Sequence, residues 1–185
     1  MRVFAAARHV RTRVESVRSR LASVRALMST KPHETKLPEF PEGLRRVFAE
    51  RPAGRLMGRG HPVGDYLEAY EWELLEERDG FLRLRVHLPP QVRNPRGDLF
   101  GGFTPTYVDL VALLTYRAGQ PPTSPRGWLH TMNMRIDYFE PIKDGFFIES
   151  EVIRKRGRNG WIETRFLDGH GTLLAFALTT LRAAE

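Results

Sequence analysis

The pattern of apolar and polar positions divides the chain into a basic N-terminal segment and a periodic region that begins near residue 66. In residues 81–88 every second position is apolar, and the positions between them carry arginine or histidine. This alternation is typical of a strand in an antiparallel sheet with one buried face. Residues 69–78 read as the preceding strand, and Asp79 and Gly80 predict a hairpin turn between the two.

A long apolar stretch comes next and predicts a buried helix over about residues 104–118. Asp109 is the only charged residue between positions 99 and 116. A carboxylate is expensive to desolvate, so a buried one must be paired, protonated or used. Gly101 and Gly102 stand directly before the helix, where free backbone N–H groups can hold a developing negative charge. This combination suggests hydrolysis of an acyl compound.

Four further strands are predicted after the helix, over residues 128–140, 146–155, 161–167 and 172–181. The alternation in the first of them places Met132, Met134, Ile136 and Tyr138 on one face. One helix among hairpin-connected strands indicates an α+β fold with an antiparallel sheet. Residues 41–50 predict a short helix inside a proline- and glycine-punctuated linker that covers residues 29–65.

Residues 1–28 form a separate segment, for which we expect a basic amphipathic helix. Its apolar residues recur in alternating steps of four and three: Val3, Ala7, Val10, Val14, Val17, Leu21, Val24 and Met28. Four interpretations stay open. They are a short coiled coil, a helix lying on an anionic membrane surface, a mitochondrial presequence, and an artefact of a start site whose true position is Met28.

The charge distribution argues against a nucleic-acid partner. The net charge is +7, but residues 1–27 hold seven arginines and one glutamate, which leaves +1 for the remaining 158 residues. A nucleic-acid footprint is expected on the folded domain, and that domain is nearly neutral. The absence of cysteine excludes disulfides, thiolate metal sites and cysteine nucleophiles. Four of the six histidines, namely His61, His87, His130 and His170, show no metal-ligand spacing.

Residues 94–109 read NPRGDLFGGFTPTYVD. The order of Asn94, Gly97, Gly101, Gly102 and Asp109 resembles the motif of hotdog-fold acyl-CoA thioesterases, in particular those of the phenylacetate-pathway type. The segments IDYFEP at 136–141 and DGHGTLLAFA at 168–177 match as well, so the resemblance spans about residues 66–182. It implies a hotdog fold over residues 66–185, in which an antiparallel sheet wraps around one long central helix.

The resemblance also implies roles. The N–H group of Gly101, with that of Gly102, would hold the thioester oxygen as it becomes an oxyanion. Asp109 would activate water or attack the thioester directly, across a dimer interface from the partner's helix. Asn94 would orient the carbonyl or the water, and Thr131 would help to place the water. Asn94 also has a structural interpretation as a turn residue, and Thr131 as an ordinary strand threonine. The chemistry needs one base and an oxyanion site, so no metal or cofactor is expected.

The expected substrate is an acyl-CoA. The candidate acyl pocket suits an aromatic or medium-chain group and consists of Phe100, Phe103, Tyr107 and Tyr138. A basic turn is expected near the CoA phosphates and contains Arg154, Lys155, Arg156 and Arg158. The family carries histidine where Phe100 stands, and this departure keeps a second reading open: a non-catalytic module that binds acyl-CoA as a sensor or structural partner.

We expect the chain to act as a homodimer or a dimer of dimers. The expected location is the cytoplasm, or the mitochondrion if residues 1–28 are a presequence. Contact with a membrane surface would run through the same residues.

Overall fold

The structure is a computed structural model that describes residues 42–120 and 127–184, apart from the side chains at positions 44 and 45. The expected N-terminal helical extension and its apolar stripe therefore lie outside the described residues. Within the described part, no helix is both long enough and apolar enough to cross a membrane.

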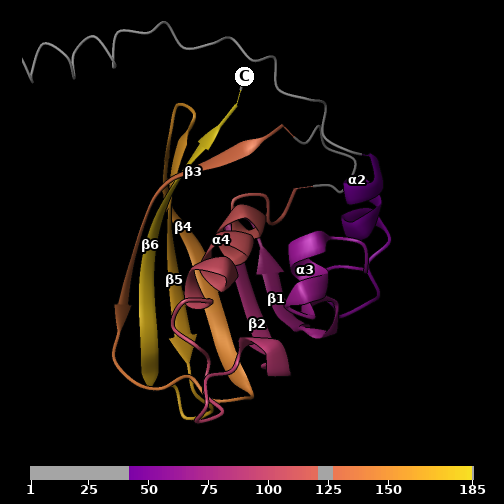
Figure 1. Cartoon of the computed structure of the whole chain (residues 1–185). Helices are drawn as coiled ribbons and strands as arrows, with labels where there is room; N and C mark the ends of the chain where they lie inside the picture. The colour runs from indigo at the N-terminus through magenta and orange to yellow at the C-terminus, as the bar shows by residue number, and fades with distance from the viewer. Residues whose placement is uncertain (1–41, 121–126, 185) are drawn as a thin grey trace, which may run out of the picture. The chain divides into compact units, whose positions relative to one another are not determined.

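The described residues form one six-stranded antiparallel sheet in the order β1-β2-β4-β5-β6-β3 (Figure 1). A single helix, α4 (Thr104–Thr115), packs on one face and contacts β2 to β6. The strands are β1 Glu73–Arg78, β2 Phe81–Val86, β3 Leu129–Tyr138, β4 Phe146–Arg156, β5 Asn159–Leu167 and β6 Leu173–Ala183. The predicted α+β arrangement of an antiparallel sheet with a helix against it is confirmed, although α4 ends at Thr115 rather than near residue 118.

The alternation in β2 separates a buried face from an exposed one, as its sequence predicts. Leu82, Leu84 and Val86 are buried beneath α4, whereas Arg83 and Arg85 face outward. Arg83 pairs with Glu149 of the neighbouring strand β4 at 3.3 Å. The β1–β2 hairpin also turns at Asp79 and Gly80, where Gly80 has a φ of 66° that suits glycine.

The segment predicted as a linker contributes to the core. It contains α2 (Glu42–Ala49) and α3 (Pro62–Tyr66), and the second of these helices falls where we expected a loop. Val47 and Phe48 of α2, together with Leu56 and Met57, are buried in the same apolar cluster as α4. The compact unit therefore begins earlier than residue 66.

The strand predicted over residues 69–78 begins only at Glu73. Residues Ala69–Glu71 form a 3-10 turn, η1, and Glu68 before it adopts a left-handed conformation with a φ of 54°. Trp72, directly after η1, is fully buried. Burial of this large ring against α4 redirects the chain, and local strand propensity does not foresee that.

A bulge in β3 changes which of its residues share a face. The pairing with β6 shifts register between Thr131 and Asn133. Met134 and Ile136 pack against the core, but Met132 is 56% exposed because the inserted residue moves it out of phase. The predicted common face of Met132, Met134, Ile136 and Tyr138 is therefore wrong for Met132, and Tyr138 is also exposed.

A column of aromatic rings fixes α4 on the sheet. Trp72 stacks on Tyr107 of α4 at 5.3 Å between centroids. Tyr107 meets Phe146 of β4 at 6.1 Å, and Phe146 stacks on Phe166 of β5 at 5.7 Å. All four rings are at most 1% exposed. Such pairs each add about 0.5–1.5 kcal/mol beyond the burial of their area.

The far end of α4 crosses the sheet at Gly160, which generates a prediction. A Cβ atom at this position would lie 2.7 Å from Cδ2 of Tyr116, a half-buried ring at the end of α4. Gly160→Ala should therefore lower the free energy of unfolding by about 1–3 kcal/mol, the usual range for overpacking. Gly169→Ala is the control in chemical denaturation, because no atom lies within 4 Å of a Cβ there. Equal stabilities of the two variants would contradict this packing.

Candidate functional site

The turn before α4 presents two free backbone donors. The Phe103 N–H donates to the Phe100 carbonyl at 2.8 Å, which closes a turn with Gly101 and Gly102 at its centre. Among the described residues, no group accepts a hydrogen bond from the N–H of either glycine. Both donors lie where the helix dipole adds positive potential. The turn can therefore hold an anion or a developing oxyanion.

The two glycines differ in what the fold requires of them. Neither has a positive φ. A Cβ atom at Gly102 would lie 2.7 Å from Cε1 of Phe100, so the Phe100 ring packs directly on that glycine. At Gly101 the nearest atom would be Cε1 of Tyr138, at an ordinary contact distance of 4.0 Å. The fold of this chain would therefore accept a Cβ atom at position 101, and glycine there keeps the N–H accessible.

Asn94 holds the loop that leads into the turn. Its side-chain oxygen accepts hydrogen bonds from the N–H groups of Arg96, at 2.8 Å, and Asp98, at 3.2 Å. Its own N–H donates to the Asp98 carbonyl at 2.8 Å. This is the geometry of a turn residue. The side-chain oxygen of Asn94 is therefore used within the loop, as expected of a turn residue. Its amide NH₂ group remains available to a ligand.

Asp144, in the segment before β4, connects to the same loop through a second set of hydrogen bonds. The Asp144 carboxylate accepts hydrogen bonds from the Leu88 N–H at 2.8 Å, from Arg93 at 2.7 Å and from the Gly145 N–H at 2.9 Å. Burial alone would raise the pKa of Asp144, but these hydrogen bonds and the Arg93 charge outweigh it, so the pKa lies below its usual value.

Asp109 projects from the second turn of α4 toward β3. The hydroxyl of Thr131 in β3 donates a hydrogen bond to the Asp109 carboxylate. The predicted burial of this carboxylate is wrong for the single chain, because Asp109 is only half-buried and Thr131 is exposed. β3 is an edge strand, so nothing described lies beyond it to cover the pair.

Three of the four aromatic residues predicted to line a pocket surround the turn. Phe100 is 53% exposed and meets Phe103 edge-on at 6.0 Å. Tyr138 is 51% exposed, and its hydroxyl donates to the Gly101 carbonyl at 2.9 Å. Tyr107 is fully buried in the aromatic column, so it does not line the exposed pocket as its place in the sequence suggests. Tyr66 of α3, which the sequence analysis missed, packs against Phe103 at 5.9 Å.

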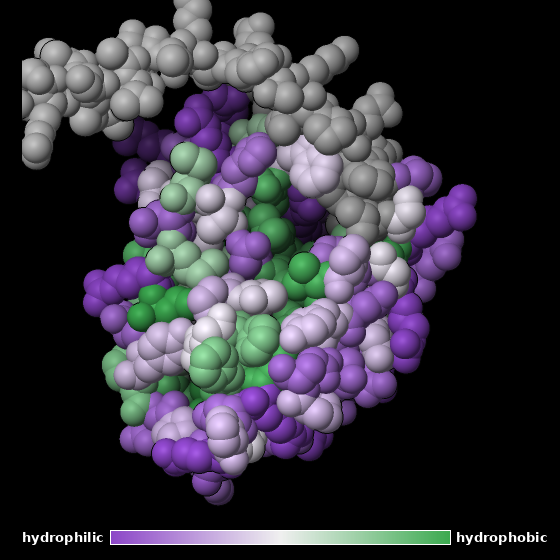
Figure 2. Space-filling view, in the orientation of Figure 1, coloured by the Kyte–Doolittle hydropathy of each residue, from purple (hydrophilic) through white to green (hydrophobic). Residues whose placement is uncertain are grey.

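An apolar hollow of about 130 Å³ lies beside the C-terminal half of α4. Leu113, one helical turn after Asp109, forms part of its wall. Figure 2 shows apolar residues gathered across the middle of this face, over α4, with hydrophilic residues around them. The remaining lining residues are Phe48, His61, Leu110, Leu114, Arg117, Trp128 and Leu129.

The basic turn between β4 and β5 is exposed, as its sequence suggests. Arg154, Lys155, Arg156 and Arg158 are all exposed. The Lys155 ammonium lies 4.8 Å from the centre of the Tyr116 ring, which ties the turn to the end of α4. A hollow of about 610 Å³ is lined by Arg156, Gly157, Arg158, Asn159, Trp161 and Arg182. Arg182 comes from β6, and only the pairing of β6 with β5 reveals that it joins this group.

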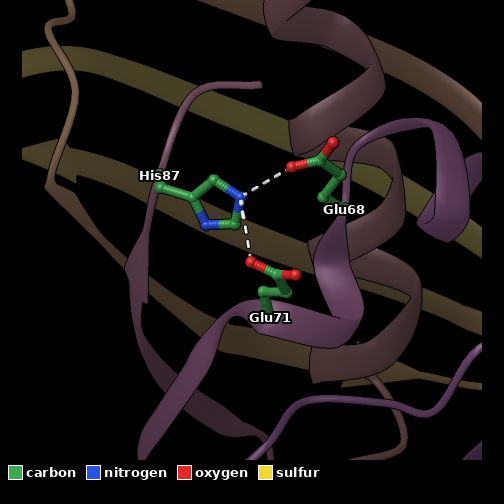
Figure 3. A group of neighbouring side chains, drawn as sticks. All are labelled: Glu68, Glu71 and His87. Carbon is green, nitrogen blue, oxygen red and sulfur yellow. Dashed lines mark hydrogen bonds and ion pairs between the residues drawn. The ribbon is translucent and has the colours of Figure 1, made fainter. Parts of the chain in front are cut away.

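One group of described residues has donor atoms suited to a cation. His87, for which the sequence showed no ligand spacing, lies beside Glu68 and Glu71 (Figure 3). Its Nε2 atom is 3.1 Å from a Glu68 oxygen and 4.0 Å from a Glu71 oxygen. The left-handed backbone at Glu68 makes this meeting possible. A hydrogen-bonded histidine–glutamate pair accounts for the geometry without an ion, and we assign the group no role.

Comparisons with known proteins agree with this architecture. No protein-family model matches the sequence, and no curated protein matches it significantly. Among solved structures, zebrafish thioesterase superfamily member 2 has 20% sequence identity and a TM-score of 0.59, over 76% of this chain and 96% of its own. A hypothetical thioesterase from Streptococcus pneumoniae, solved with coenzyme A, has 18% identity and a TM-score of 0.53, over 62% and 86%.

A third structure, a Streptococcus mutans protein bound to acetyl-CoA, has 16% identity and a TM-score of 0.52, over 62% of this chain and 89% of its own. The pneumococcal thioesterase has also been solved with an aspartate or a threonine replaced by alanine. These likenesses show that the chain has the hotdog fold of thioesterase-superfamily proteins. At these identities, the activity must be argued from the residues themselves.

The hydrogen bonds to Asp144 and its ion pair with Arg93 lead to a testable prediction. Because its pKa is lowered in the folded chain, its contribution to stability is complete above the unfolded pKa and is lost as pH falls through the folded pKa. Asp144→Asn should therefore lower the melting temperature at pH 7, and the difference from wild type should shrink below about pH 4. Asp79→Asn, which removes no hydrogen bond found in the structure, is the control. A difference that does not change with pH would contradict the electrostatic role.

Proposed function

We propose that the protein hydrolyses acyl-CoA thioesters. Two features of the site support the proposal. Gly101 and Gly102, directly before α4, present a pair of free N–H groups. Asp109, within α4, presents a carboxylate that accepts a hydrogen bond from Thr131. A thioester is an activated acyl group, so one oxyanion site and one base suffice for its hydrolysis. The fold shared with a hypothetical thioesterase solved with coenzyme A, and with a protein bound to acetyl-CoA, supports the same reading.

In the proposed reaction the thioester oxygen accepts hydrogen bonds from the glycine N–H groups. Asp109 removes a proton from water while the water oxygen bonds to the carbonyl carbon. The tetrahedral intermediate collapses, the carbon–sulfur bond breaks, and the thiolate of CoA takes the proton back from Asp109. The Thr131 hydroxyl occupies one carboxylate oxygen and leaves the other for water. Direct attack of Asp109 on the thioester, followed by hydrolysis of the anhydride, would use the same groups.

The site needs a second chain. Asp109 lies five residues into α4, which places it about 7.5 Å along the helix axis from Thr104. The glycine turn precedes Thr104, so the donors and the carboxylate of one chain are offset along α4, and we infer that they act on different carbonyls. Two α4 helices that pack side by side in a dimer would bring the turn of one chain to Asp109 of the other.

The two sheet edges differ in a way that favours β3 as the dimer edge. β1 exposes charged residues, among them Glu73, Glu76 and Arg78, and such charges discourage pairing between edges. β3 ends the sheet on the other side and exposes large apolar side chains at Met132 and Tyr138, with Phe139 directly after it. Pairing through β3 would cover these side chains together with Thr131 and Asp109.

The proposed binding mode for the substrate follows from the surroundings. The acyl chain would run from Asp109 into the apolar hollow at Leu113, with Phe100 and Phe103 on the side of the glycine turn. The basic turn between β4 and β5 would hold the CoA phosphates, where arginine is suited to bidentate contacts. We propose Arg182 as an additional member of this group, next to Arg156.

A second candidate function is binding of acyl-CoA without hydrolysis. The observation that favours it is the Phe100 ring, which packs on Gly102 and is 53% exposed, where the related thioesterases carry a polar histidine. Release of free CoA thiol from short, medium, long and aromatic acyl-CoAs distinguishes the two functions. Binding without thiol release would favour the second.

Asp109→Asn tests the proposed base because it keeps the shape of the side chain and removes its charge. We expect turnover to fall by about two orders of magnitude or more, the scale of general base catalysis. The control is Asp79→Asn, an exposed carboxylate of the β1–β2 turn, on the opposite side of the sheet from β3. If a folded Asp109→Asn protein releases thiol at the wild-type rate, Asp109 is not the catalytic base.

Met132→Glu tests the dimer edge. Introducing a charge on β3 should shift the protein toward monomer in light scattering and lower thiol release with it. Leu75→Glu is the matched control, because Leu75 is 47% exposed on the opposite edge strand, β1. A dimer that survives Met132→Glu but dissociates with Leu75→Glu would place the interface at β1 instead.

A further inference from the structure

Tyr138 contacts the glycine turn through a specific hydrogen bond as well as through its ring. It is the last residue of β3, and its hydroxyl donates to the Gly101 carbonyl at 2.9 Å. The same carbonyl accepts the Thr104 N–H at 3.3 Å. Two donors from different elements, β3 and the start of α4, therefore hold one peptide carbonyl.

That carbonyl belongs to the same rigid unit as the N–H of Gly102. The peptide bond between Gly101 and Gly102 is planar and trans, so its C=O and N–H point in opposite directions. Fixing the carbonyl toward Tyr138 and the helix fixes the Gly102 N–H in the opposite direction, away from the helix. Two adjacent glycines have a soft backbone, and without this constraint the peptide could rotate.

Rotation of this peptide would be damaging for an oxyanion site. It would turn a carbonyl oxygen toward the position that the N–H had faced, so an acceptor would replace a donor. The hydrogen bonds to the carbonyl also polarise the peptide, which strengthens its N–H as a donor. The hydroxyl of Tyr138 therefore affects both the direction and the strength of the Gly102 donor.

We propose that Tyr138 is a positioning residue that holds the Gly101–Gly102 peptide so that the Gly102 N–H faces the thioester oxygen. The inference rests on the proposed hydrolysis of acyl-CoA. It gives Tyr138 a role different from that of a pocket wall, because the hydroxyl acts and not only the ring. It also identifies Gly102 as a donor of the oxyanion site in its own right, beside Gly101.

The test compares Tyr138→Phe with Tyr70→Phe. The first removes the hydroxyl that bonds the Gly101 carbonyl and keeps the ring. The second removes a tyrosine hydroxyl from η1, for which the structure shows no hydrogen bond and whose ring contacts Arg59 instead of the glycine turn. We expect Tyr138→Phe to lower kcat by about tenfold with little change in KM, less than the loss of a whole oxyanion donor. Tyr70→Phe should retain the wild-type kcat.

A spectroscopic measurement separates positioning from a general structural effect. A ketone analogue, with a methylene between sulfur and carbonyl, binds without being cleaved, and its carbonyl stretch shifts to lower wavenumber when N–H groups bond it. The shift should be smaller in Tyr138→Phe than in the wild type and unchanged in Tyr70→Phe. An unchanged kcat and an unchanged shift in Tyr138→Phe, with an active wild type, would overturn the role of Tyr138 alone. A wild type that releases no thiol from any acyl-CoA would overturn the proposed function, and this role with it.

Discussion

The packing of Tyr107 between Trp72 and Phe146 is the interaction on which the rest of the structure depends. It joins the segment between η1 and β1, α4 and the sheet in a single buried column that continues to Phe166. Because α4 is anchored through Tyr107, the positions of the glycine turn at its start and of Asp109 in its second turn are both set. The orphaned Tyr107 hydroxyl has no hydrogen-bond partner among the described residues, and burial, with the nearby Asp144 and Glu68 carboxylates, raises its pKa. The column is therefore an apolar anchor and not part of the chemistry.

The second constraint belongs to the proposed dimer, in which each chain supplies only part of each site. The loop before α4 is tightly braced by Asn94 and Asp144, so the glycine donors are preorganised. The carboxylate, by contrast, lies at an open edge, where Thr131 is its hydrogen-bond partner among the described residues. Preorganised donors lower the reorganisation that a developing charge demands, and a partner chain would exclude the water that weakens them. The same surface would then serve assembly and catalysis, since covering β3 completes the site.

The sequence predicts much of this fold and less of the site. The alternation in β2, the hairpin at Asp79 and Gly80 and the apolar run of α4 are local signals, and the structure follows them. The bulge near Met132 depends on pairing with β6, and the turn at Glu68 depends on burial of Trp72; neither is local. Tyr107 reads as a pocket residue in the sequence because an aromatic residue near a motif does not reveal which side of a helix faces the core. Tyr66 and Arg182 join their groups only through tertiary packing, so sequence spacing carried no signal for them.

The central claim is that the glycine donors of one chain act with Asp109 of another, and purified mixed dimers test it most directly. One chain would carry Asp109→Asn and the other Gly101→Val; a Cβ atom at position 101 meets nothing closer than Tyr138 at 4.0 Å, and the two methyl groups beyond it would cover the N–H. In a shared site, one of the two sites of each mixed dimer is intact, so thiol release should recover to about half of the wild-type rate per dimer. If donors and carboxylate act within one chain, every site of the mixed dimer carries a defect. Thiol release no higher than that of the two parent variants would contradict the account.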